Sequence, residues 1–217
     1  MQSLFLRPAV HLASVGDDVV SLDVQSGDYS CLPGVGGFVP RPGPDGRLDL
    51  AVGEIADLLL ETGLAVREAA AGVRTDLPPR ASASFWRTER ASITLADQRR
   101  FARACLSATP QFWRAPFGAL MAIVQRGRLA RADGSMSALE RDAQVFDQLA
   151  PFAPFQGECL FRAFLLLAYL RLERRDATWV FGVRTYPFQA HCWLQVGDTV
   201  INDAVERICG YTPILAV

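Results

Sequence analysis

The sequence predicts an α+β protein built from two parts. Residues 1–78 are predicted to form a small module of a three-stranded sheet plus helices. Residues 79–217 are predicted to form a domain in which a central cysteine-bearing helix packs on an antiparallel sheet. Three observations support this: apolar residues alternate with polar ones over the first thirty positions, they recur at helical spacing through the middle of the chain, and a nearly all-apolar segment precedes strand-like segments near the C-terminus.

The N-terminal module is predicted from alternation and turn-forming residues. Three segments separated by Gly16-Asp17 and by Gln25-Ser26-Gly27 are typical of a strand meander: Val10–Val15, Val19–Val24 and Asp28–Leu32. The Gly- and Pro-rich residues 33–46 predict a loop. Apolar residues at helical spacing then predict a helix over Val52–Leu64.

The middle of the chain is predicted to be helical. After a linker at residues 75–80, two segments have the spacing of a capping box, Thr94–Asp97 and Ser137–Glu140. They predict helices running towards Ser107 and Leu149. Between them, aromatic and aliphatic residues from Phe112 to Val124 predict an amphipathic helix with Pro116 near its first turn.

The C-terminal third is predicted to place one buried helix before three strands. Residues 159–172 are apolar on nearly every face, as in a fully buried helix. The strands expected after it are Thr178–Val183, Ala190–Val196 and Thr199–Asp203, the last two joined around Gly197-Asp198.

Composition excludes several classes of function. The formal net charge is −1, so no strong overall field favours nucleic acid or an anionic membrane. Five scattered cysteines without a CxxC motif predict neither a disulfide scaffold nor a metal site. The N-terminus lacks the pattern of a signal peptide, and the apolar run from residue 159 is too short to span a bilayer. The prediction is a cytoplasmic protein with no metal, no nucleic acid and no membrane partner.

The candidate chemistry centres on Cys159, at the predicted start of the buried helix after Gly157. A helix N-terminus favours the thiolate, and its free N–H groups can stabilise an oxyanion, for which Gln156 is a further candidate donor. His191 lies on a later strand and Asp203 on the next, which is the order a cysteine–histidine–aspartate set requires.

One geometric condition follows from the alternation of side chains along a strand. A regular two-residue turn at Gly197-Asp198 would place Cys192, not His191, on the same face as Asp203. The three-residue set therefore predicts an odd-length turn or a bulge in this hairpin.

Packing is the competing interpretation of these residues. A lone cysteine in an apolar helix is usually a small core residue, and Trp193 is expected to cover His191. The other cysteines have no catalytic context and are assigned to packing: Cys31, Cys105, Cys192 and Cys209.

Several motifs together resemble the transglutaminase-like B proteins of lasso peptide biosynthesis. They are Gly157-Glu158-Cys159-Leu160-Phe161-Arg162-Ala163, Phe181-Gly182-Val183-Arg184, Pro187-Phe188-Gln189-Ala190-His191-Cys192-Trp193 and Val200-Ile201-Asn202-Asp203. The resemblance implies a transglutaminase-like, papain-like peptidase domain. It also implies that Cys159, His191 and Asp203 are the catalytic triad of a peptidase that removes the leader from a precursor peptide.

Some members of that family carry an N-terminal leader-recognition module with a PqqD-like, winged-helix-like fold, and residues 1–78 match its outline. The resemblance implies that the leader binds as an added strand. The residues implied in leader binding are Asp28, Tyr29, Ser30, Cys31, Leu32, Ile55, Leu58 and Leu59.

The implied reaction is hydrolysis of one peptide bond through a thioester on Cys159, with no metal and no organic cofactor. The implied partners are the precursor peptide and an asparagine-synthetase-like cyclase that closes the macrolactam. Two alternatives remain open. The domain would transfer the acyl group to an amine, as a transglutaminase does, or the chain would deliver leader peptides without catalysis.

Overall fold

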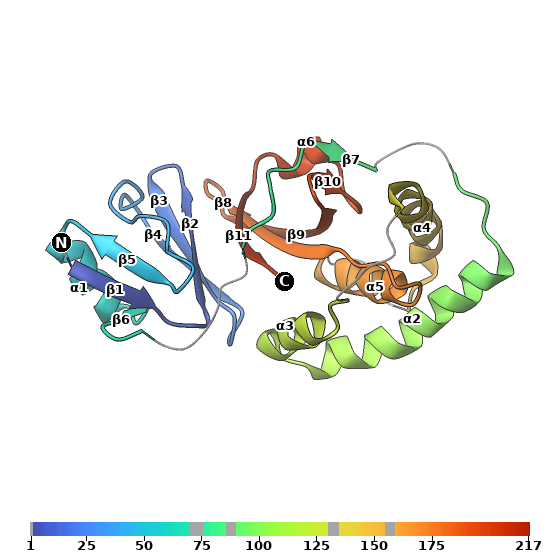
Figure 1. Ribbon diagram of the computed structural model, residues 1–217, viewed down its shortest axis with the longest axis horizontal. Coiled ribbons are helices and arrows are strands. Elements are labelled where there is room, and N and C mark those ends of the chain that lie inside the picture. The colour runs from blue at the N-terminus through green and yellow to red at the C-terminus, as the bar shows by residue number, and fades with distance from the viewer. Residues whose placement is uncertain (1, 70–75, 86–89, 130–134, 155–158) are drawn as a thin grey trace. The chain divides into compact units, whose positions relative to one another are not determined.

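The chain is described by a computed structural model that covers residues 2–69, 76–85, 90–129, 135–154 and 159–217. Figure 1 shows the arrangement of its elements. The strands are β1 (Gln2–Leu6), β2 (Val10–Val15), β3 (Asp18–Asp23), β4 (Asp28–Leu32), β5 (Arg47–Leu50), β6 (Ala65–Val66), β7 (Ala83–Ser84), β8 (Thr178–Arg184), β9 (Gln189–Val196), β10 (Thr199–Val200) and β11 (Thr212–Ala216). The helices are α1 (Gly53–Glu61), α2 (Leu95–Arg114), α3 (Phe117–Arg126), α4 (Met136–Leu149), η1 (Ala150–Phe152), α5 (Cys159–Arg171) and α6 (Val205–Ile208).

The chain divides into two compact units, with a boundary between Leu77 and Pro78. The first unit also takes in Phe181–Ala190 and Tyr211–Ala216, while the second contains the remaining residues from Pro78 onwards. The division therefore falls beside the predicted boundary at residue 78, but two short C-terminal segments belong to the first unit.

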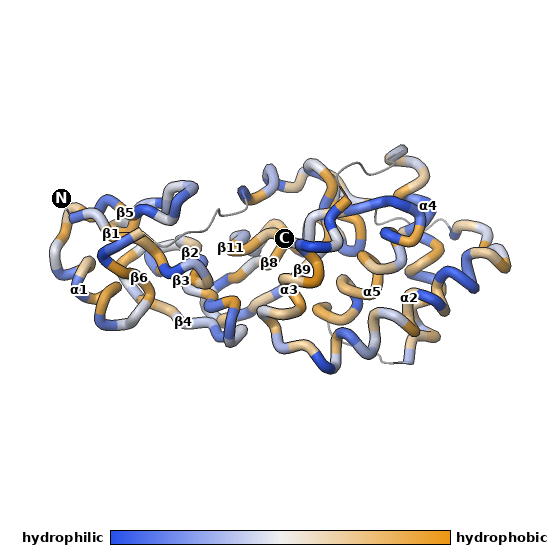
Figure 2. The backbone as a smooth tube through the Cα atoms, turned by 60° about the horizontal axis from the view of Figure 1, so that its bottom comes forward, coloured by the Kyte–Doolittle hydropathy of each residue, from blue (hydrophilic) through white to orange (hydrophobic). Residues whose placement is uncertain are grey.

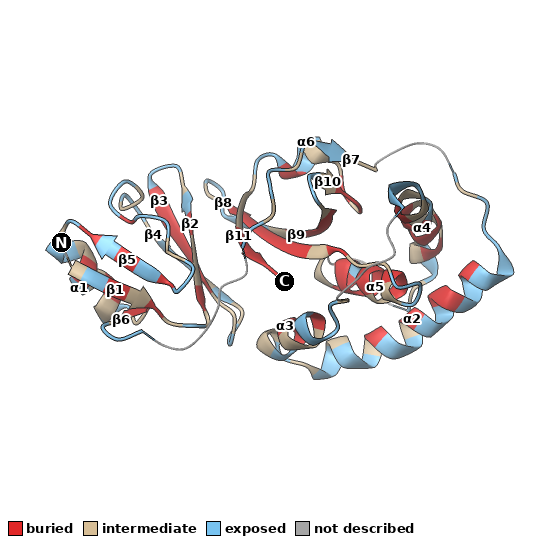
Figure 3. Cartoon of the chain, in the orientation of Figure 1, coloured by how far each residue is buried: buried red, intermediate tan, exposed pale blue. Residues whose placement is uncertain are grey.

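The predicted meander is present in the first unit. Strands β2, β3 and β4 form an antiparallel sheet in that order, and residue pairs such as Val10↔Asp23 and Val19↔Leu32 set its register. β3 is buried along five of its six residues (Figure 3). Both of its faces are therefore covered, and β4 lies at the edge of the sheet.

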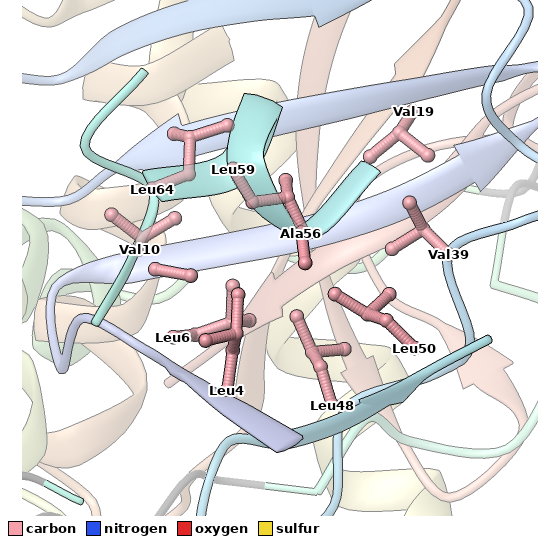
Figure 4. Packing of buried hydrophobic residues seen from close by; sticks show 11 residues of the cluster. Leu4, Leu6, Val10, Val19, Val39, Leu48, Leu50, Ala56, Leu59 and Leu64 are labelled. Carbon is pink, nitrogen blue, oxygen red and sulfur yellow. The ribbon is translucent and has the colours of Figure 1, made fainter. Parts of the chain in front are cut away.

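A second sheet in this unit was not predicted. β1 pairs with β5 and β6, so Leu4 lies opposite Leu48 and Leu6 opposite Ala65. These strands, α1 and one face of the meander enclose a single apolar core (Figure 4), in which Leu4, Leu48 and Leu59 are at most 1% exposed. The prediction of three strands followed by helices is therefore corrected: the described part of the module contains two sheets and one helix. A PqqD-like fold stays a prediction.

The helices of the second unit follow the capping signals only in part. Thr94 forms the predicted capping box with Asp97, and α2 begins at Leu95 as expected. The helix runs on past Pro110 to Arg114, so Phe112 and Trp113 lie in α2 rather than in the next helix. The prediction of a box at Ser137 is wrong, because α4 begins at Met136 and its N-cap residue, Ser135, makes no side-chain capping bond.

Helix α5 is the centre of the second unit, as predicted. Eight of its thirteen residues are buried (Figure 3), and most of its length consists of hydrophobic residues (Figure 2). α2 and α4 pack against it, with Phe101 and Phe146 in contact with the ring of Tyr169. Burying each such aromatic or aliphatic side chain contributes about 1.5–3 kcal/mol, so α5 is held firmly in place.

Four C-terminal strands and β7 form a five-stranded sheet in the order β11-β8-β9-β10-β7. β9 and β10 pair antiparallel as predicted, but β7 pairs with β10 in parallel, so the prediction of an antiparallel sheet is corrected to a mixed one. Its inner strands are apolar and buried: Trp179, Trp193 and Leu194 are at most 1% exposed. None of the helices described here is long and apolar enough to cross a membrane.

Candidate active site

Cys159 is the first residue of α5 and is partly exposed, whereas the helix behind it is buried. Its backbone position is therefore set by a largely buried helix, while the residue itself remains partly exposed. Gln156 and Gly157, predicted to precede it as an oxyanion donor and a helix-start residue, lie outside the described residues.

The turn between β9 and β10 is regular, contrary to the predicted irregularity. Val196 pairs with Thr199 and Gln195 with Val200, which leaves Gly197 and Asp198 as a two-residue turn. Gly197 has a φ of 57°, which suits the first position of the tight turns that connect antiparallel strands. The expectation of an odd-length turn or a bulge is therefore wrong.

The backbone pairing between β9 and β10 (the β9–β10 ladder) instead ends early, and this allows Asp203 to turn towards His191. β10 stops at Val200, and residues 201–203 bend away from the strand direction. The last backbone bond runs from Ile201 N–H to Leu194 O at 2.9 Å, and the Leu194 N–H donates to the side-chain oxygen of Asn202 at 2.7 Å. Beyond this point strict face alternation no longer applies to the two segments, and Asp203 turns towards His191.

His191 and Asp203 are in direct contact. The His191 Nε2 and Asp203 Oδ2 atoms are 2.6 Å apart, and both side chains are largely buried, at 12% and 10% exposed. The hydrogen bond with Asp203, together with one to Cys159, raises the pKa of His191 to about 9. The second Asp203 oxygen accepts the Ala204 N–H, which holds the carboxylate in place.

Cys159 is held as a thiolate. Hydrogen bonds from the side chain of Cys192, from His191 and from the Cys192 backbone outweigh burial and lower the pKa of Cys159 to about 4. Because Nε2 of His191 faces Asp203, Nδ1 is the ring nitrogen left for Cys159. Between pH of about 4 and about 9 the site therefore rests as a thiolate–imidazolium pair, the form that attacks a carbonyl.

Two residues that sequence reasoning did not assign to the site belong to it. Cys192, predicted to serve packing alone, is 2% exposed and is the largest cause of the lowered pKa of Cys159. Asn202 closes the end of the β9–β10 ladder through its side chain. In the sequence, Cys192 and Asn202 could have been noticed only because they are neighbours of His191 and Asp203. Neighbours in sequence do not reveal which side chains the bend at residues 201–203 brings into contact. Trp193 does lie beside His191, with ring centroids 6.3 Å apart.

The predicted leader-binding residues divide between surface and core. On β4, Asp28, Ser30 and Cys31 are exposed, while Tyr29 contacts Phe188 with ring centroids 5.7 Å apart. Leu32 and Ile55 are partly buried against the module core, Leu58 is partly buried on α1, and Leu59 is fully buried in that core. A peptide bound along β4 would contact the exposed residues of that strand. Leu59 lies in the core and would support the module without contacting the peptide. Their role in binding stays a prediction.

Within the described residues, no group of three or more His, Cys, Asp or Glu side chains is placed to hold a metal ion. The site's own groups are a sulfur nucleophile, an imidazolium and a carboxylate. Such a set can form and break an acyl thioester using protons held on its own side chains.

Comparison with known proteins relates the second half of the chain to one family. A family model described as the transglutaminase-like superfamily matches residues 105–216, which include Cys159, His191 and Asp203. The Microcin J25-processing protein McjB of Escherichia coli is 46% identical over 50 residues. That match covers 23% of this chain and 24% of the relative, so the chain spans about a quarter of the length of the curated relative it matches. No solved structure gives a significant match.

Proposed function

The chain belongs to the transglutaminase-like superfamily, and on that premise we propose that it is a cysteine peptidase that removes the leader from a lasso precursor peptide. The observation that carries the proposal is the contact chain from Cys159 through His191 to Asp203, with the cysteine ionised at neutral pH. The similarity to a protein named for processing microcin J25 supports a ribosomal peptide as the substrate.

The proposed reaction begins from the resting ion pair. The Cys159 thiolate attacks the carbonyl carbon of the bond between leader and core, and the proton on Nδ1 of His191 passes to the departing amine. Because the thiol is already ionised, His191 does not have to act as a base before substrate arrives. The thioester left on Cys159 is then hydrolysed, with neutral His191 accepting a proton from water, while Asp203 keeps the ring oriented.

The proposed leader site is the edge of β4 that faces away from β3 and pairs with no other strand among the described residues. An edge strand offers unpaired backbone groups along one side, and an extended peptide pairs with them as an added strand. Asp28, Ser30 and Cys31 on this strand are exposed and would contact the leader's side chains. The released core peptide would pass to an ATP-dependent, asparagine-synthetase-like cyclase, which we propose as the partner.

The test uses the full chain with a precursor peptide, the cyclase and ATP, and reads product masses. Cys159→Ala is expected to abolish leader release while a labelled leader still binds. Cys105→Ala, which removes a cysteine from α2 of the same unit, is the matched control and is expected to cleave normally. Equal leader release by wild type and Cys159→Ala would reject the peptidase and favour peptide delivery without catalysis.

The same reaction run in ¹⁸O-labelled water separates hydrolysis from acyl transfer. A peptidase places one labelled oxygen in the new carboxylate of the leader. A transglutaminase-type enzyme given a primary amine instead yields an amide at that position, without the label. Formation of the amide as the main product would replace the proposed function with acyl transfer.

A further inference from the structure

The first segment of the second unit pairs with the hairpin that carries the candidate catalytic residues. Residues 79–85, which we term the strap, contain β7, and β7 pairs in parallel with β10 (Figure 1). The Phe85 N–H donates to the carbonyl of Val200 at 2.9 Å. Val200 is the last residue of β10 and precedes the bend that leads to Asp203. One end of the strap is therefore bonded to the residue at which the β9–β10 ladder ends.

The other end of the strap is held by the side chain of Gln195. This glutamine is 2% exposed, and its Nε2 donates to the carbonyls of Pro79 and Gly197 at 2.7 Å each. Its Oε1 accepts the indole N–H of Trp193 at 3.0 Å. A buried amide is destabilising when one of its polar groups has no partner. The strap supplies one of the three partners that satisfy this one.

His191, Trp193 and Gln195 form a row on one face of β9. Side chains alternate along a strand, so residues at every second position share a face. The rings of Trp193 and His191 lie side by side, with centroids 6.3 Å apart and planes inclined by 30°. Trp193 is 1% exposed and bonded to Gln195, so its indole is fixed in place. The row thus runs from the Pro79 carbonyl of the strap to the imidazole that contacts Asp203.

We propose that Gln195 is a positioning residue: it bonds the strap on one side and Trp193 on the other, and so holds the indole against His191 and keeps the imidazole aligned with Asp203. This inference rests on the proposed role of His191 in catalysis. The hydrogen bond at Nε2 fixes one point of the imidazole ring but not its plane. The flat indole beside the ring restricts that plane, and Gln195 restricts the indole.

The test is an NMR titration of His191 in the full chain, without substrate or partner. Gln195→Met keeps a side chain of similar length but removes all three hydrogen bonds. The pKa of His191 is expected to fall from about 9 by about 1 pH unit, because a misaligned imidazolium bonds Asp203 less well. A glutamine that only stabilises the fold would lower the unfolding temperature and leave this pKa unchanged.

Two proline variants in the strap test the same role without altering β9. The Ala83 N–H donates to the Asp198 carbonyl at 3.3 Å, and the Phe85 N–H also faces β10, so in this parallel register the Ser84 N–H points away. Ala83→Pro removes a bond to the hairpin and places the proline ring against it. It is expected to lower the pKa of His191 as Gln195→Met does. Ser84→Pro is the matched control and is expected to titrate as wild type.

Circular dichroism checks the folding of each variant, and the proline pair decides if Gln195→Met does not fold. An unchanged pKa of His191 in folded Gln195→Met, or equal shifts in the two proline variants, would overturn the positioning role. With precursor peptide, Gln195→Met is expected to lower kcat by about 10- to 100-fold with KM unchanged. A wild-type chain that releases no leader would instead reject the proposed function, and the titration, which needs no substrate, would still decide the role of Gln195.

Discussion

The charge on Asp203 is expected to set the upper pH limit of the reactive pair, and Asp203→Asn tests this directly. Asn keeps an oxygen that can accept the His191 Nε2–H, so the ring keeps its orientation while the negative charge is lost. The pKa of His191 is raised from 6.5 to about 9. At about 1.4 kcal/mol per pH unit, this corresponds to roughly 3 kcal/mol in favour of the imidazolium.

The bond with Asp203 is the largest cause of that shift, and Cys159 supplies the next. A hydrogen bond between charged groups contributes about 1.5–3 kcal/mol, so Asp203→Asn is expected to lower the pKa of His191 by about 1 to 2 pH units. Because the folded pKa lies above the ordinary value, the stabilisation is complete below pH 6.5 and is lost as pH rises through about 9. The ion pair of the variant should therefore disappear at a lower pH than that of wild type.

NMR titration of the imidazole carbons is the direct assay, because the chain contains only two histidines. His11 lies on β2 and supplies the reference signal. Asp198→Asn is the matched control: this carboxylate lies in the turn of the same hairpin and bonds the hydroxyl of Ser82 instead of His191. A His191 midpoint that does not move in Asp203→Asn, or that moves equally in Asp198→Asn, would refute the assigned cause.

Three predictions concern stability. Asp142→Asn is expected to lower the free energy of unfolding by about 3–5 kcal/mol, because Asp142 is 2% exposed and pairs with the buried Arg100 at 2.6 Å; an unchanged urea midpoint would contradict this. Gly36→Ala is expected to cost about 1–3 kcal/mol, since its Cβ would come within 2.8 Å of a backbone carbonyl carbon, whereas Gly37→Ala has free space and serves as the control. Thr94→Ala removes the capping bond of α2 and is expected to cost about 1 kcal/mol, and thermal unfolding with no loss would count against the capping box.

Local patterns in the sequence were sufficient for much of the fold. Alternation and turn residues located β2, β3 and β4 within a residue of their observed bounds, because a meander is made of neighbours in sequence. The apolar run from Cys159 predicted α5 for a similar reason, since a helix apolar on all sides can only be buried. β1 was missed because its partners, β5 and β6, lie far from it in the sequence, beyond the whole β2–β4 meander.

The sequence by itself determined the chemical types in the candidate site: Cys159 at the start of a helix, His191 on a strand and Asp203 on the strand predicted to follow it, although that strand ends at Val200. Tertiary structure alone decided how they meet. Alternation along β9 and β10 predicted that a regular turn would separate His191 from Asp203, and the turn is regular. They nevertheless lie 2.6 Å apart because the ladder ends at Val200. Where backbone pairing between two strands ends is a consequence of the whole fold that no residue pattern encodes.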